Sequence, residues 1–204
     1  MIAALYVQTG GVYCGLPDVD PWDEARDARL YPGPWPVVAH PPCQLWVNFA
    51  TLNFKRYGGE HNRPGNDGGC FAAALAAVRT WGGVLEHPAS SNAWAAHGLP
   101  APVGRGWQAC GPGEWVAEVW QSAYGHRARK RTWLYAVTPC PPPLDRRAPA
   151  GTAQVGWQFV GPNCRGEVAR KAPLGKREAS ATPLPFRDLL LAIARSVPRR
   201  EVVA

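Results

Sequence analysis

Apolar runs in this chain are short, and each ends at a turn or at proline. Residues 3–7 are apolar and lead into the glycine-containing segment 9–11, a pattern typical of a strand followed by a tight turn. Residues 37–39 form a second apolar run, which stops at Pro41 and Pro42 because proline lacks the backbone donor of a strand and restricts the residue before it. Both runs therefore predict brief, buried strands.

A helix and a third strand are predicted next to each other further along the chain. Residues 70–81, "CFAAALAAVRTW", are strong helix formers with apolar side chains at helical spacing, and two glycines end the segment. The following run, "GVLEHP" at 83–88, predicts a buried strand ended by proline. Strand, helix and strand in this order are typical of a parallel α/β sheet, in which ligands bind beyond the carboxyl ends of the strands.

Three further segments are predicted from composition. Residues 22–31, "WDEARDARLY", have an acidic first turn and later arginines, which favours a short helix. Residues 51–69 are polar and rich in glycine, which predicts a mobile loop. Residues 138–154 are rich in proline without apolar periodicity, and we expect an extended surface connection there.

The length and composition fit one α/β domain covering residues 1–204, with a largely parallel sheet flanked by helices. The chain has 204 residues, 46% of them hydrophobic and 18% charged, which is enough to bury a core. No run of apolar residues is long enough to span a membrane, and no secretion leader is evident at the N-terminus. We therefore expect no membrane contact and a cytoplasmic location.

The charge balance points to a polyanionic partner. The 22 lysines and arginines outnumber 15 aspartates and glutamates, giving a net charge of +7 that suits DNA, although many basic proteins bind none. The six cysteines show neither a CxxC pair nor tight spacing, which argues against a disulfide framework and against an ordinary structural zinc site. No obligate protein partner is inferred.

Chemically useful side chains follow two of the predicted strands. His40 and Cys43 come after the strand at 37–39, while Glu86 and His87 end the strand at 83–88. At these strand ends a cysteine is suited to act as a nucleophile once deprotonated, and a nearby carboxyl is suited to act as an acid. The alternative is a buried, unreactive Cys43 with Glu86 as an anchor for the loop.

The segments "AHPPC" at 39–43 and "LEHP" at 85–88 resemble the cytosine-C5 DNA methyltransferases, whose Pro-Pro-Cys loop and Glu-Asn-Val strand end occur in this order. Short, phage-type members are the most similar. "SAYGHRARKRTWLYAV" at 122–137 and "ATPLPFRDLLLAIARSV" at 181–197 resemble their later segments. The resemblance covers residues 37–197 and implies a Rossmann-like methyltransferase core, acting in the host cytoplasm if phage-encoded.

The resemblance also implies roles for individual residues. Cys43 would add to C6 of a flipped-out pyrimidine, and Glu86 would donate a hydrogen bond or proton at N3, which together make C5 nucleophilic. The implied substrate contacts are His40, Pro42, Trp46, His87, Arg129, Lys130, Arg131 and Thr132.

The N-terminal segment departs from the family pattern. In place of the glycine-rich turn that holds S-adenosylmethionine, the chain has "ALYVQTGGVYCGL". Thr9, Gly10 and Gly11, together with Asp20, are the residues that a reduced form of this cofactor site would use. His87 stands where the family has asparagine, and no separate recognition domain is evident between residues 98 and 116.

Other interpretations stay open at this point. The thiolate chemistry could join a different group to C5 or process a modified pyrimidine in phage DNA, and the chain could also be a catalytically inactive DNA-binding module. His40, Cys43, His87 and His126 could converge on a metal, but their spacing does not require it, so no metal site is predicted.

Overall fold

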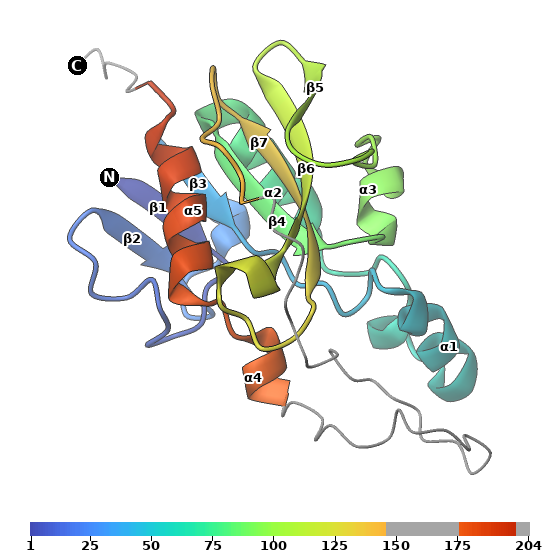
Figure 1. Cartoon of the computed structure of the whole chain (residues 1–204). Helices are drawn as coiled ribbons and strands as arrows, with labels where there is room; N and C mark the ends of the chain where they lie inside the picture. Colours follow the sequence, from blue (N-terminus) through green and yellow to red (C-terminus); the bar gives the residue numbers. More distant parts are fainter. Residues whose placement is uncertain (146–175, 199–204) are drawn as a thin grey trace.

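The computed structural model describes residues 1–145 and 176–198 (Figure 1). These residues form a seven-stranded sheet with helices on both faces. The strands are β1 (Ile2–Leu5), β2 (Val19–Trp22), β3 (Val37–Ala39), β4 (Gly83–Pro88), β5 (Gln108–Gly111), β6 (Glu114–Trp120) and β7 (Arg131–Val137). The helices are α1 (Asn48–Tyr57), α2 (Cys70–Trp81), α3 (Asn92–Ala96), α4 (Lys176–Ser180) and α5 (Leu184–Arg195), with short 3-10 turns η1 (Ala28–Leu30), η2 (Glu60–Asn62) and η3 (Gln121–Tyr124).

The sheet is mixed, with the order β2-β1-β3-β4-β7-β6-β5. Strands β2, β1, β3 and β4 are parallel neighbours, whereas β7 is antiparallel to β4 and continues into antiparallel pairs with β6 and then β5. The prediction of a largely parallel sheet is therefore correct for the first half only. In the second half the chain forms the antiparallel strands β5, β6 and β7. The sequence pattern predicted no strands in this region, so it did not predict the antiparallel pairing.

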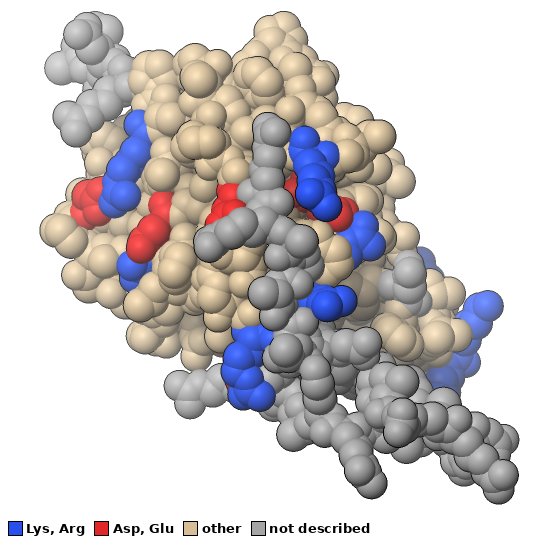
Figure 2. Space-filling view, in the orientation of Figure 1, with Lys and Arg blue, Asp and Glu red and all other residues tan. Residues whose placement is uncertain are grey.

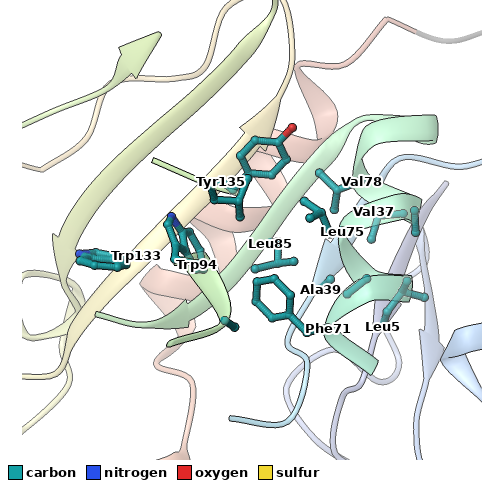
Figure 3. Close-up of a cluster of buried hydrophobic side chains, with 14 of the residues drawn as sticks. Leu5, Val37, Ala39, Phe71, Leu75, Val78, Leu85, Trp94, Trp133 and Tyr135 are labelled. Atoms are coloured by element: carbon teal, nitrogen blue, oxygen red, sulfur yellow. The ribbon is translucent and has the colours of Figure 1, made fainter. Parts of the chain in front are cut away.

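Strict alternation along the strands gives the sheet two apolar faces. Leu5, Val37 and Leu85 face α2, which packs on them through Phe71 and Leu75 and lies behind the sheet in Figure 1 (Figure 3). The residues between them on the strands face α5, which lies in front. Each face of the sheet is covered by a helix, which fixes the register of the strands, because a slip by one residue would exchange the side chains of the two faces.

Helix α5 covers the second face with an amphipathic pattern. Its side chains Phe186, Leu190 and Ile193 are fully buried against Val38 and Val84. Burial of each large side chain contributes about 1.5–3 kcal/mol to folding. The segment 181–197, singled out in the sequence only by resemblance, therefore contains a helix that forms an integral layer of the fold.

Two local predictions need correction, and a third is tested only over its first residues. Residues 22–31 contain only the short turn η1, because β2 takes up the segment through Trp22. Residues 51–69 include most of α1 and the turn η2, so the polar composition concealed a mostly exposed helix. In the predicted connection, residues 138–145 have no helix or strand, and the rest of 138–154 lies outside the described residues.

The chain changes direction within the sheet at β1. From β1 it passes to β2 on one side and then to β3 on the other, so the loops after β1 and β3 diverge at their carboxyl ends. Such a switch point is where ligands bind in open α/β sheets. At the opposite, amino ends of β3 and β4, Gly83 lets the two strands approach closely, since a Cβ there would lie 2.0 Å from the Val37 carbonyl oxygen.

Candidate active site

His40 and Glu86 form a hydrogen-bonded pair at the ends of two parallel strands. Ala39 is paired in register with Leu85, so the next residue of each chain segment lies side by side on the same face of the sheet. The His40 Nδ1 atom lies 3.0 Å from the Glu86 Oε2 atom. The prediction that these two strand ends meet is confirmed.

The pair belongs to a longer chain of polar contacts, here called the Glu86 network. The Tyr13 hydroxyl lies 2.8 Å from His40 Nε2, on the side opposite Glu86. Gln121 Nε2 donates to Glu86 Oε1 at 3.2 Å and to Thr132 Oγ1 at 2.9 Å. The network therefore connects the loop after β1 with β3, β4, η3 and β7, and it accounts for both carboxylate oxygens.

Glu86 is 9% exposed and is held as a carboxylate. Burial by itself raises the pKa of this carboxyl, but the hydrogen bond from His40 and the positive charge of Lys130 outweigh it and lower the pKa to about 2. The side chain is thus an ionised acceptor at neutral pH. The sequence-based expectation that Glu86 donates a proton is met only if another group supplies that proton.

Cys43 lies on the loop after β3, half-buried, with its carbonyl accepting from Trp46 N at 2.9 Å in a tight turn. Burial and the neighbouring Glu86 carboxylate raise the pKa of the Cys43 thiol, while Lys130 opposes them. The thiol is therefore protonated at neutral pH in this arrangement. It is suited to nucleophilic addition after losing its proton, and Lys130 is the cation that favours this loss.

His87 lies on the other face of the sheet, because successive strand residues point in opposite directions. It is 1% exposed, stacks on Trp94 and meets Phe71 edge-on. Burial lowers the pKa of His87 to about 4 although Glu86 and the Pro42 carbonyl favour the charged ring, and neither ring nitrogen makes a hydrogen bond of good geometry. The assignment of His87 to the substrate-binding set is therefore withdrawn.

Trp46 is also a core residue. Its ring is 8% exposed, packs against Phe71 and His97, and donates to Asp67 Oδ2 at 2.8 Å. A ring with these partners offers no free face to a base, so the assignment of Trp46 to base stacking is withdrawn. Pro42, by contrast, is exposed next to Cys43, where a ligand can reach it.

The basic segment before β7 divides between the two faces. Arg129 is exposed and Lys130 half-buried, and the charge of Lys130 acts on Glu86. Arg131 instead pairs with Glu118 of β6 at 2.7 Å, and Thr132 is fully buried within the Glu86 network. In Figure 2 acidic side chains stand beside several of the basic ones, so part of the positive charge is neutralised internally.

The predicted cofactor residues form a separate group, here called the N-terminal corner: Thr9, Gly10, Gly11 and Asp20. The tight turn is confirmed, since Gly11 N donates to Gln8 O at 2.9 Å and Gly10 has a φ of +66°. The polar side chains, however, are already engaged. Thr9 donates to Asp23, while Asp20 accepts from Arg26 at 2.6 Å and from the Trp22 indole at 2.9 Å.

Two members of the Glu86 network, Tyr13 and Gln121, were not recognised in the sequence. Tyr13 follows a glycine-rich turn and Gln121 stands between an apolar strand and a serine, contexts without a motif. The available signal was general: a fully buried carboxylate requires donors from somewhere, and polar residues near strand ends are the first to consider.

Comparison of the chain with protein-family models, curated proteins and solved structures gives no match. Within residues 1–145 and 176–198, no group of three or more His, Cys, Asp and Glu side chains is arranged to hold a metal ion. No helix in the same residues is both long and apolar enough to cross a bilayer.

Proposed function

We propose that this protein modifies pyrimidines in DNA at C5 through a covalent bond between Cys43 and C6 of the base. The supporting observation is that a thiol and a buried carboxylate lie at the ends of neighbouring parallel strands, close enough for their charges to interact. The chemistry needs this pair on one side of a base. The charge of Lys130 acts on both groups, and exposed Pro42 and Arg129 adjoin Cys43 and Lys130 in the sequence, which suits contact with a DNA strand.

The two groups divide the work in a definite way. Attack of the Cys43 thiolate on C6 pushes electrons toward N3 of the ring, and a hydrogen-bonding acid at N3 stabilises that charge. The resulting enamine is nucleophilic at C5. Glu86 is the group suited to N3, and the rigid network on its far side fixes the direction of its oxygens.

The parallel half of the sheet supports a Rossmann-like core of the methyltransferase type, since β1, β2, β3 and β4 surround a switch point. The N-terminal corner fits S-adenosylmethionine poorly, because Asp20 is engaged by Arg26 and Thr9 by Asp23. The resemblance implies methyl transfer as the reaction at C5. Because the fit to the methyl donor is poor, the alternatives are transfer of another group to C5 or processing of a modified pyrimidine.

A second candidate is a catalytically inactive DNA-binding module. The observation in its favour is that the pKa of Cys43 is raised by burial and Glu86, so the resting thiol is unreactive. Both candidates predict DNA binding, and only the first predicts chemistry at C5.

Exchange of the C5 hydrogen distinguishes them without any cofactor. Addition of a thiolate at C6 lets C5 take a proton from water, and elimination then releases the original hydrogen. We expect the protein to release tritium from DNA containing [5-3H]cytosine, and Cys43→Ala to abolish the release while leaving DNA affinity within a few-fold. Cys110→Ala, which changes a half-buried thiol on β5, is the matched control. Release by Cys43→Ala at the wild-type rate would exclude the covalent mechanism.

A further inference from the structure

The proton nearest to Glu86 lies on His40. A carboxylate only accepts hydrogen bonds, so in the contact of 3.0 Å the hydrogen must be carried by His40 Nδ1 and directed at Glu86 Oε2. The opposite ring nitrogen, Nε2, lies 2.8 Å from the Tyr13 hydroxyl. The imidazole is thus held at both nitrogens, with its Nδ1–H aimed at the carboxylate.

The proposed reaction needs such a proton. Glu86 is ionised in the resting protein and cannot by itself protonate N3 of a base. Water is a poor alternative, because Glu86 and His40 have side chains only 11% and 14% exposed. An internal donor in contact with the carboxylate removes this difficulty.

We propose that His40 supplies the proton that Glu86 delivers to the base, and that Tyr13 positions the His40 ring for this transfer; this inference rests on the proposed function. Cys43 first gives its thiol proton to solvent, and His40 begins the step with a hydrogen on both ring nitrogens. The Sγ–C6 bond then forms and the ring electrons move to N3. N3 takes a proton from Glu86, which takes the Nδ1 proton of His40. His40 becomes neutral and keeps the hydrogen on Nε2, bonded to the Tyr13 oxygen. Elimination of Cys43 reverses each transfer, so no proton is lost.

Tyr13 suits this role because it stays a neutral phenol. It is 3% exposed, and burial followed by the charge of Glu86 raises its pKa well above the ordinary value. Several titratable and charged groups surround Tyr13, His40 and Glu86 and act on them electrostatically: Cys43, His87, Lys130, Arg187 and Asp188. Lys130 favours the carboxylate, so proton transfer depends on the base and the developing charge at N3.

The test uses His40→Asn in the C5 exchange assay, with thermal melting and DNA affinity measured on the same preparation. The asparagine amide takes the place of Nδ1 and donates to Glu86, but it cannot supply a proton. We expect the rate of C5 exchange to fall by about 10–100-fold in His40→Asn while melting temperature and DNA affinity stay near the wild-type values. A merely structural role of the ring would not separate these quantities. His61→Asn, at an exposed histidine of η2, is the matched control and should behave as wild type.

Tyr13→Phe removes a single oxygen and provides a second test. Loss of this oxygen leaves Nε2–H without its acceptor, so the His40 ring is positioned less firmly and C5 exchange should fall, by less than in His40→Asn, with melting temperature and DNA affinity little changed. Exchange at the wild-type rate in His40→Asn would overturn the inference while leaving Cys43 chemistry intact. Absence of exchange in the wild-type protein would instead reject the proposed function, and the inference with it.

Discussion

The Glu86 network and the N-terminal corner both involve neighbouring parallel strands and the loop after β1, yet they are built differently. The partners in the Glu86 network are distant in sequence, 27 residues apart for Tyr13 and His40 and 46 for His40 and Glu86, and they are largely buried. In the N-terminal corner Asp20 pairs with Arg26 only six residues away, and both are substantially exposed.

This difference separates a costly arrangement from an inexpensive one. Burying a carboxylate costs several kcal/mol unless it is paired and hydrogen-bonded, whereas an exposed local ion pair contributes about 0–1 kcal/mol. Polar groups at strand ends are therefore common and by themselves indicate little. A carboxylate that is buried and hydrogen-bonded by residues distant in sequence is costly to maintain, and this cost points to a functional role.

Glu86→Gln should produce the largest effect on the comparison. The amide keeps an oxygen for His40 but cannot carry the proton, so C5 exchange should fall by about 100-fold or more. Because a charge-assisted hydrogen bond is lost, unfolding free energy should also fall, by about 1–2 kcal/mol. Exchange kinetics and thermal melting on one preparation measure both.

The control for this variant is Glu118→Gln, which alters a carboxylate paired with Arg131 on the other side of β7. It should leave exchange per folded molecule unchanged. If Glu86→Gln lost stability while exchange per folded molecule stayed at the wild-type level, Glu86 would be a structural anchor and the catalytic role would have to be abandoned.

Neutralising Arg129 and Lys130 together should weaken DNA binding by about tenfold at low salt. Fewer counterions are released on binding, so the slope of log affinity against log salt should become shallower by about two. The equivalent change at Arg26 and Arg29, which pair locally with Asp20 and Asp27, should alter neither quantity. DNA-binding titrations at several salt concentrations measure both quantities. Equal slopes in the two variants would show that the basic segment does not contact DNA.

Acid should destabilise the protein in a window that belongs to the Glu86 network. The pKa of Glu86 is lowered when folded, so its contribution is present above the ordinary value of 4.5 and is lost as pH falls toward about 2. His87, neutral when folded, adds an earlier loss as pH falls from 6.5 toward about 4. Urea unfolding at pH 7, 5 and 3 should show that Glu86→Gln lacks the lower window, whereas Asp20→Asn, at an exposed pair, differs little from wild type.

The smallest effect is expected from Gly10→Ala in the N-terminal corner. A Cβ at this position has open space around it, so only the left-handed φ of +66° is unfavourable and the cost should be about 1 kcal/mol. Exchange at C5 should be unaffected. Calorimetry with S-adenosylmethionine shows whether this turn holds a cofactor: binding that is lost in Gly10→Ala would place the donor here, against the poor fit of Asp20.

Three strands of the parallel half, β1, β3 and β4, could be predicted because each is a short apolar run followed by proline or glycine. The strand at Val19–Trp22 was missed because it contains Asp20 and Pro21, which is tolerated at the sheet edge where β2 lies. Helix α1 was missed because its surface is polar and its packing slight, so no apolar periodicity announces it.

The site was predictable only in part, for a similar reason. The sequence predicted that His40 and Glu86 lie close together, because each stands at the carboxyl end of a predicted strand and the two strands are parallel neighbours. It could not show which of Glu86 and His87 faces the site and which faces the core, because this depends on which face α2 and α5 cover. Gln121 and Tyr13 join through tertiary packing, which leaves no local pattern.

The wide sequence span of the Glu86 network has a consequence for folding. Its carboxylate lies on β4, but Gln121 and Thr132 arrive only with the antiparallel half of the sheet, after β7 has paired with β4. Contacts between distant segments form late, because closing the intervening loops costs entropy. A chain that has assembled only its parallel strands would thus have Glu86 paired with His40 but without the hydrogen bond from Gln121. During refolding, recovery of C5 exchange should lag behind the formation of helix and strand signals and report the last step of assembly.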